Sequence, residues 1–271
     1  MVVLTSDAST AEVYLQGAHV THFQRRGDEP LLFLSRASRF ECGKAIRGGV
    51  PIIFPWFGDR PGCPAHGFAR ARPWRLVASE ARADGTVCAT FELFAAEGDP
   101  PFHAQYRVAI RDELALELRI TNPAPDRTLE FEQCLHTYFA VGDIGSVELH
   151  GLQGARFMDK VAGGAIGQQG EVALRIAAET DRVYRDTCST VVIDDPAWER
   201  RITVAKVQSQ STVVWNPWVE KSRRLADMAP EEYRRMLCVE VGNVGPNRMV
   251  LPAGQGMTMA VRIASAPLVG A

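Results

Sequence analysis

The sequence predicts an all-β protein, a large antiparallel β-sandwich formed by a single domain over residues 1–271. Short runs of apolar or alternating residues recur at spacings of about 8–12 residues, which is typical of sandwich strands. Turn signals separate these runs throughout, and the chain contains 23 glycines and 16 prolines. We find no repeat of about 20–50 residues and no linker long enough to separate domains.

The first half of the chain predicts strands joined by short turns. In order, these are AEVYLQ and AHVTHFQ around Gly17, LLFLS after RRGDEP, and WRLVASEA and TVCATFELFA joined by the hairpin signal Asp84-Gly85. Residues 36–46 read as irregular. Residues 47–58, RGGVPIIFPWFG, are apolar but hold two prolines and three glycines. That composition excludes a helix and favours an edge strand or a folded-in loop, which we expect to fix Arg47 against aromatic side chains.

The second half continues the pattern and contains one helix signal. The expected strands are residues 106–110, 114–120 and 129–141, then VELHGL, LRIAAE, the hairpin TVVIDD and RRITVAKV, STVVWNPW, and residues 237–241 and 257–263. Ala229-Pro230-Glu231-Glu232 is the helix start, because proline lies near the first turn and the acids lie at the positive end of the helix dipole. We expect this helix to be too short to matter for the architecture.

Charge and cysteine usage narrow the classes of function. Lys plus Arg total 30 against 32 Asp plus Glu, a net charge of −2, which gives no electrostatic footprint for nucleic acid or a membrane surface. The six cysteines are scattered without a C-x-x-C pair, which favours buried thiols in a reducing compartment. The N-terminus shows no signal peptide, and no apolar run is long enough to span a bilayer. We therefore expect a cytoplasmic monomer with no nucleic-acid or membrane partner.

Several common chemistries have no motif in this chain. The phosphate-binding loop, the dinucleotide fingerprint and the hydrolase nucleophile elbow are all missing from the sequence. Cys63, His66 and His136 could be assembled into a metal site, but a C-x-x-H spacing without a second pair is a weak signal. We therefore expect neither a cofactor nor a metal.

Two strand residues are the candidates for acid–base chemistry. In LEFEQCLHTYFAV, residues 129–141, alternation places His136 on a polar face with Cys134 and Tyr138, opposite a mostly apolar face. In MLCVEVGN, Glu240 lies on the face opposite the leucine and valines, and a carboxylate within so apolar a strand is rarely buried without a purpose. Together they suit an acid–base pair. The alternatives are a core histidine bonded to a backbone carbonyl and a glutamate paired with a buried arginine.

Two groups of basic residues could recognise an anion. The first group is Arg47, His66, Arg70 and Arg72, and the second is Lys221, Arg223 and Arg224. Each is more often surface charge than a ligand. Arg47 and Arg70 stand out because they lie beside glycine and rigid aromatic or proline-rich sequence, and an arginine fork suits phosphate or carboxylate. The tryptophans and phenylalanines near both groups could stack on a sugar ring or belong to the core.

Six segments in this order resemble the glucose-6-phosphate 1-epimerases of the aldose 1-epimerase superfamily. They are RGGVPIIFPWFG, HGFARARPW, LHTYF, DRVYRDT, VVWNPW and RMLCVEVGN, and the resemblance runs from about residue 11 to residue 263. It implies a galactose mutarotase-like supersandwich with the site on a concave sheet face. It also implies that His136 is the general acid and Glu240 the general base. Further implied contacts are Arg47 and Arg70 to phosphate, His66 and Asp181 to sugar hydroxyls, and, with looser matches, Arg72 and Lys221.

The implied reaction is the interconversion of the α and β anomers of D-hexose 6-phosphates, with glucose 6-phosphate as the expected substrate. It proceeds by acid–base opening and closure of the sugar ring and requires no metal, nucleotide or covalent intermediate. Two alternatives remain open at this point. One is an aldose 1-epimerase for unphosphorylated sugars, which would share His136 and Glu240 but gain little from Arg47 and Arg70. The other is a non-catalytic carbohydrate-binding protein, which would use the aromatic residues and need no acid–base pair.

Overall fold

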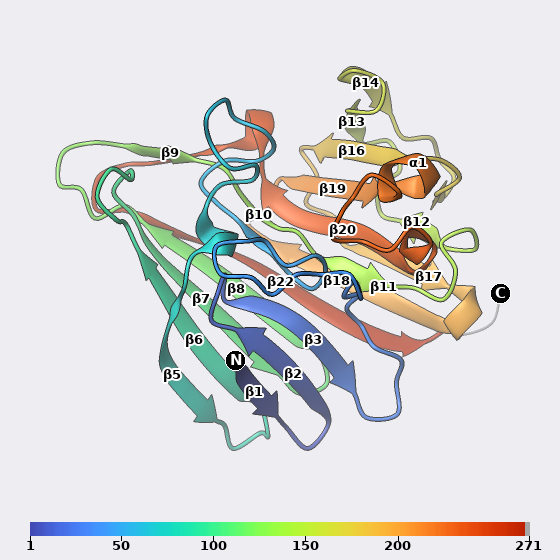
Figure 1. The fold of residues 1–271 in the computed structure, drawn as a ribbon, viewed down its shortest axis with the longest axis horizontal. Helices are drawn as coiled ribbons and strands as arrows, with labels where there is room; N and C mark the ends of the chain where they lie inside the picture. Colours follow the sequence, from blue (N-terminus) through green and yellow to red (C-terminus); the bar gives the residue numbers. More distant parts are fainter. Residues whose placement is uncertain (269–271) are drawn as a thin grey trace.

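The computed structural model describes residues 1–268, and nearly all of its regular structure is antiparallel strand (Figure 1). A nine-stranded sheet has the order β15 (Leu174–Arg175), β12 (Glu148–His150), β17 (Val191–Asp195), β18 (Arg200–Val207), β22 (Gly256–Pro267), β8 (Leu114–Thr121), β7 (His103–Ile110), β6 (Val87–Phe94) and β5 (Arg75–Ala81). An eight-stranded sheet has the order β14 (Ala165–Gln168), β13 (Arg156–Asp159), β16 (Thr180–Arg185), β19 (Ser211–Asn216), β20 (Met236–Asn243), β10 (Gln133–Leu135) and β4 (Ile52–Ile53), with β11 (Tyr138–Ala140) also paired to β20.

Two smaller sheets complete the structure. The three-stranded sheet contains β1 (Val2–Thr5), β2 (Ser9–Tyr14) and β3 (His19–Arg25), and the two-stranded sheet pairs β21 (Met249–Leu251) with β9 (Leu129–Phe131). The helical segments are α1 (Trp218–Ser222) and the 3-10 turns η1 (Ala69–Ala71), η2 (Pro196–Trp198), η3 (Glu232–Arg235) and η4 (Gly245–Asn247). Every helix within residues 1–268 is too short, and too little apolar, to cross a bilayer.

The predicted all-β antiparallel class is confirmed, and the local differences have physical reasons. The segment 129–141 is not one strand but three, because β9 pairs with β21 whereas β10 and β11 both pair with β20 and are separated by a short break at His136 and Thr137. LLFLS forms only isolated bridges, and the strand β1 was not predicted. The helix expected at Ala229 is the 3-10 turn η3, whereas the α-helix α1 follows the strand β19 directly. Residues 47–58 do contribute a short edge strand, β4.

The strand β20 divides the core from the candidate site. Leu237, Val239 and Val241 lie in one buried apolar cluster that also contains residues of the nine-stranded sheet, such as Leu116 and Ile202. The eight-stranded sheet therefore buries this face against the nine-stranded sheet. The alternate residues of β20, Glu240 among them, point to the other face of the sheet.

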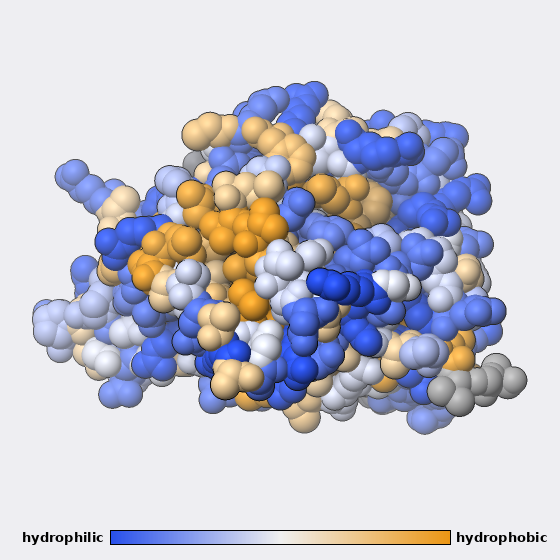
Figure 2. All heavy atoms as spheres, turned by 90° about the horizontal axis from the view of Figure 1, so that it is seen from below, coloured by the Kyte–Doolittle hydropathy of each residue, from blue (hydrophilic) through white to orange (hydrophobic). Residues whose placement is uncertain are grey.

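The edge strand β5 is exposed along its whole length. Leu76 and Val77 on β5 and Val3 on β1 are large apolar side chains that solvent reaches. Figure 2 shows apolar residues gathered on the side of the molecule where β5 lies in Figure 1, surrounded by hydrophilic residues. These strands contribute no residue to the cavity described below.

All six cysteines are free thiols. The expectation of buried thiols holds for Cys88, Cys134 and Cys238, whereas the other three are exposed.

Candidate active site

The register of the eight-stranded sheet arranges the candidate residues in three rows across its open face. The first row is Asp181, Trp215, Cys238 and Tyr138; the second is Val183, Val213, Glu240 and His136; the third is Arg185, Ser211, Gly242 and Cys134. His136 lies in the short break between β10 and β11, and both strands pair with β20 in the same register. That register sets His136 directly opposite Glu240.

His136 and Glu240 are in contact. The His136 Nε2 atom lies 3.2 Å from Glu240 Oε1, and the side chains are 10% and 1% exposed, respectively. The imidazole stacks on the Tyr138 ring with centroids 4.8 Å apart and meets the Trp215 ring edge-on. Two strand segments separated by about a hundred residues of chain thus deliver an acid and a base to the same point.

Burial sets the protonation of this pair. It raises the pKa of the Glu240 carboxyl to about 8, because the charged form loses its water and no arginine or lysine among residues 1–268 lies within ion-pair distance. Burial also holds the pKa of His136 well below its usual value, and the nearby Arg70 and Arg47 add to this effect. These surroundings therefore favour a protonated carboxyl beside a neutral imidazole.

Two buried thiols flank the carboxylate. The Cys134 Sγ donates to Glu240 Oε2 at 3.4 Å, which leaves Oε1 for His136. The ligand atoms of His136, Cys238 and Glu240 lie within 4.8 Å of one another, close enough to surround a metal ion. Burial raises the pKa of the Cys238 thiol.

A tight loop brings His66 beside His136. The His66 ring meets the His136 ring edge-on at 5.8 Å, and its Nδ1 accepts the Gly58 N–H at 3.2 Å. Gly67 follows with φ +72°, and a Cβ there would lie 2.0 Å from the Phe54 carbonyl oxygen, so this turn requires glycine. Burial lowers the pKa of His66 to about 3, with the charge of Arg70 as the next cause. The ring is therefore neutral with its proton on Nε2, which makes it a hydrogen-bond donor.

Of the three predicted arginines, only Arg47 lines the cavity. It donates to Asp227 Oδ1 at 3.1 Å and to the Tyr138 hydroxyl at 2.9 Å. Hydrogen bonds to these two residues therefore hold Arg47, rather than packing against the aromatic side chains of residues 47–58. Arg70 is half-buried, does not line the cavity and donates to the Ala65 carbonyl oxygen at 2.7 Å.

The structure does not bring Arg72 to the site. Its guanidinium forms a bidentate ion pair with Asp99 and lies over the Phe68 ring, 3.6 Å from the centroid. Both terminal nitrogens of Arg72 are therefore paired with Asp99, and Arg72 is not among the residues that line the cavity.

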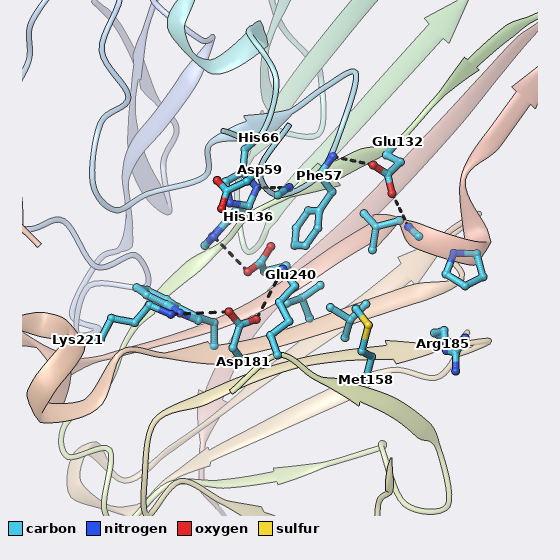
Figure 3. A pocket seen from close by; sticks show the side chains of 18 of the residues that line it. Phe57, Asp59, His66, Glu132, His136, Met158, Asp181, Arg185, Lys221 and Glu240 are labelled. Carbon is cyan, nitrogen blue, oxygen red and sulfur yellow. Dashed lines mark hydrogen bonds and ion pairs between the residues drawn. The ribbon is translucent and has the colours of Figure 1, made fainter. Parts of the chain in front are cut away.

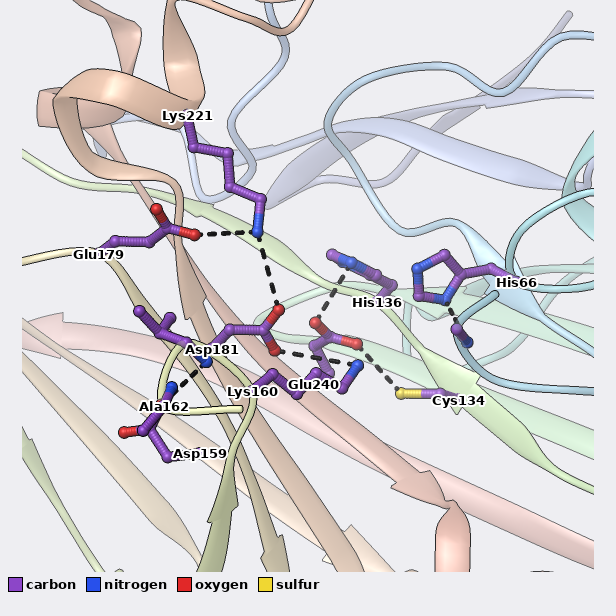
Figure 4. A network of polar contacts seen from close by, with 12 residues as sticks. His66, Cys134, His136, Asp159, Lys160, Ala162, Glu179, Asp181, Lys221 and Glu240 are labelled. Carbon is purple, nitrogen blue, oxygen red and sulfur yellow. Dashed lines mark hydrogen bonds and ion pairs between the residues drawn. The ribbon is translucent and has the colours of Figure 1, made fainter. Parts of the chain in front are cut away.

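Asp181 and Lys221 lie together on the opposite wall (Figure 4). Lys221 Nζ is 3.0 Å from Glu179 Oε1 and 4.0 Å from Asp181 Oδ2, and Lys160 Nζ is 3.9 Å from Asp181 Oδ1. Lys160 also lies over the Phe57 ring, 4.4 Å from its centroid. Burial raises the pKa of Asp181. The alternating charges can contact several hydroxyl groups of a polar ligand.

Three residues that shape the site were not among the predicted site residues: Lys160, Glu132 and Arg185. Glu132 accepts the N–H groups of Phe57, at 2.8 Å, and of Gly245, so one carboxylate holds two wall loops together (Figure 3). Arg185 could have been found, because alternation along DRVYR places it on the same face as Asp181. Lys160 follows the end of β13, where no such pattern applies.

These residues surround a cavity of about 720 Å³. His136, Glu240, His66, Asp181 and Arg47 all line it, together with the second-row valines and Trp215. A cavity of this size with a few converging polar groups is typical of a small-molecule site. It is open to solvent at one side and places the acid–base pair at its floor.

Comparison with known proteins identifies the family. The model of the family described as "Aldose 1-epimerase" matches residues 1–264. A protein of Escherichia coli strain K12, described as "Putative glucose-6-phosphate 1-epimerase", is 37% identical over 259 residues, which cover 92% of this chain and 85% of that protein.

Solved structures agree with this match. A crystal structure described as a "putative mutarotase" from Salmonella typhimurium superposes with a TM-score of 0.90 at 33% identity, covering 98% of this chain and 90% of that one. A galactose mutarotase-like protein from Lactobacillus casei superposes with a TM-score of 0.73 at 17% identity, covering 98% and 100%, which shows the shared fold.

Proposed function

This chain belongs to the aldose 1-epimerase family, and from that premise we propose that it interconverts the α and β anomers of D-hexose 6-phosphates, glucose 6-phosphate first among them. The observation that carries the proposal is the contact between His136 and Glu240 at the floor of the cavity. The hydroxyl oxygen and the ring oxygen at an anomeric centre are attached to the same carbon. An acid and a base that act on them must therefore lie close together, as this pair does.

In the proposed reaction Glu240 removes the proton of the C1 hydroxyl while His136 donates a proton to the ring oxygen O5. The C1–O5 bond breaks and C1 becomes an aldehyde. Rotation about the C1–C2 bond then presents the other face of the aldehyde. Return of both protons closes the ring as the opposite anomer. Each group thus acts as acid in one half of the cycle and as base in the other.

The environment of the pair favours the open-chain intermediate. Ring opening starts from a carboxylate and an imidazolium and ends with a protonated carboxyl and a neutral imidazole. The latter is the state that burial favours, since burial raises the pKa of Glu240 and lowers that of His136. The low-dielectric site therefore stabilises the proton distribution that accompanies the aldehyde.

The other polar groups suit recognition of the sugar. His66 presents a neutral Nε2–H donor, and Asp181 presents carboxylate oxygens held between two lysines. Arg47 lies over the first row, where its guanidinium could meet a phosphate as well as Asp227. The stacked Tyr138 keeps the His136 ring in one orientation.

Replacement of Glu240 by Gln tests the catalytic assignment. We expect the enzyme-accelerated exchange between the anomers of glucose 6-phosphate, followed by NMR, to fall by about 2–4 orders of magnitude. A near-normal rate in a folded Glu240→Gln variant would refute the assignment. Arg72→Ala is the matched control, because Arg72 lies outside the cavity and its loss should leave the rate unchanged.

One observation favours a second candidate, an epimerase for unphosphorylated aldoses. Arg47 is already paired with Asp227, and Arg70 does not line the cavity. The ratio of kcat/KM for glucose 6-phosphate to that for glucose decides between the two. Under the first proposal, Arg47→Ala raises KM for the phosphorylated sugar alone, because it removes a contact remote from C1.

A further inference from the structure

We propose that the cavity contains a second anion subsite at Arg185, which lets the protein bind hexoses that carry a phosphate on the anomeric carbon as well as on C6. Such a bisphosphate has no free anomeric hydroxyl, so it binds without reacting and acts as an inhibitor. The inference rests on the proposed function, because that function places C1 at the His136–Glu240 pair.

The sheet register places Arg185 beyond the reacting pair. Arg185 belongs to the third row and Glu240 to the second, whereas Arg47 donates to Tyr138 in the first. The two arginines therefore lie on opposite sides of the row that holds the acid–base pair. Strand geometry puts the Arg185 Cα about 12 Å from that of Glu240, two strands and one row away. A phosphate on C1 and the arginine side chain can span this distance together.

Among residues 1–268, the cation at this end of the cavity has no ion-pair partner. Arg185 lines the cavity, and within the described residues it forms no ion pair. Each of the other cavity cations is engaged: Arg47 with Asp227, Lys221 with Glu179, and Lys160 near Asp181. The adjacent Asp186 accepts a hydrogen bond from Asn247 at 3.0 Å. An anion that enters the cavity thus meets an unpaired guanidinium only at Arg185.

The sheet register places Val213 and Val183, both of which line the cavity, between Glu240 and the strand end that carries Arg185. Other apolar residues of the cavity wall are Phe57, Met158, Val244 and Pro246. The three valines are at most 3% exposed and form a separate small cluster with Ile53 and Cys134. Figure 3 shows Arg185 on the far side of Met158 from His136 and Asp181. These side chains offer no hydrogen-bonding groups to sugar hydroxyls. This part of the cavity therefore suits the substituent on C1 and not the sugar ring. Arg185 is half-buried and lines the cavity, so its guanidinium is accessible to an anion there and can donate charge-assisted hydrogen bonds to it.

Binding of α-D-glucose 1,6-bisphosphate, measured by calorimetry, tests the subsite. We expect the native protein to bind it more tightly than glucose 6-phosphate. Arg185→Ala should raise the dissociation constant of the bisphosphate by about tenfold to a hundredfold, the range for a charge-assisted hydrogen bond. The KM for glucose 6-phosphate should change by less than about twofold. Arg185→Lys should recover part of the affinity, because it keeps the charge but loses the fork.

Arg182→Ala is the matched control. Arg182 lies on the same strand but on the opposite face, where it pairs with Asp159, and its loss should leave bisphosphate binding unchanged. The subsite is refuted if Arg185→Ala binds the bisphosphate as tightly as the native protein does. It is also refuted if the substitution lowers the affinity for glucose 6-phosphate by the same factor as the affinity for the bisphosphate. Failure of the proposed function would look different: the native protein would then not accelerate anomer exchange, whatever the calorimetry of Arg185→Ala shows.

Discussion

Two buried acidic residues of this protein, Asp195 and Glu240, differ in their partners. Asp195, at the end of β17, is fully buried with Arg200 Nε at 3.4 Å from its Oδ2, and its oxygens accept the Gly142 N–H. Arg200 in turn donates to backbone carbonyls, including that of Ala140. Glu240 is as deeply buried but contacts an imidazole and a thiol, neither of which carries a permanent charge.

The difference separates a group that supports the fold from one that is available for chemistry. Asp195 has a permanent cation and backbone donors as partners, and these oppose the effect of burial on its charge. Glu240 has partners that can themselves gain or lose a proton, so its own proton is free to move. Burial raises the pKa of both carboxyls, and it raises the pKa of Glu240 to about 8. Glu240 is therefore a carboxyl whose proton can be exchanged near neutral pH.

The largest expected effect is on the pH dependence of stability. Because the pKa of Glu240 is about 8 in the folded protein and 4.5 is its model value, the folded state keeps a proton that the unfolded state has lost between these pH values. The contribution of protonated Glu240 to the free energy of unfolding is therefore fully present below about pH 4.5. It is lost as the pH rises through 8.

The free energy of unfolding of Glu240→Gln minus that of wild type should increase by roughly 4–5 kcal/mol between pH 4 and pH 9. Denaturant unfolding of both proteins across this range measures the difference. A constant difference at all pH values would contradict the comparison, because it would show that Glu240 is ionised in the folded state.

The next largest effect concerns the structural pair. Asp195→Ala leaves the buried Arg200 without its partner and should lower the free energy of unfolding by about 3 kcal/mol, while kcat of the folded fraction stays within about threefold of wild type. Denaturant unfolding and anomer exchange measure the two quantities. Asp194→Ala is the control on the same strand: its partner Arg201 is half exposed, so the loss should be about 1 kcal/mol or less. A large loss of kcat in Asp195→Ala would break the distinction between the two sites.

The smallest effect is on the pH profile of the proposed reaction. The pair must hold one proton between its two members, and it loses this proton when pH exceeds the value of about 8 for the pKa of Glu240. We expect kcat/KM to be flat between pH 7 and 8 and to fall about tenfold per pH unit above that. The measurement uses glucose 6-phosphate as its dianion, with the uncatalysed exchange subtracted at each pH. A rate that continues to rise to pH 10 would show that a different group limits the reaction.

Much of this site follows from strand periodicity. Alternation in LHTYF and in MLCVEVGN correctly places His136 with Tyr138, and Glu240 opposite the core valines, because each strand has one face in the core. The same rule applied to DRVYR would have found Arg185. It could not find Lys160 or Asp227, which lie in segments without regular structure, nor exclude Arg72, whose partner Asp99 lies in a loop.

The sequence by itself determined the antiparallel class, most strand faces and the residue types available for proton transfer, since these depend on patterns a few residues long. Only the tertiary structure decided that His136 faces Glu240, that Arg47 forms an ion pair and that Arg185 forms none within the part of the chain that the structure describes. Those facts depend on which distant strands become neighbours and in what register, and a shift of one residue in that register would turn each side chain to the other face of the sheet.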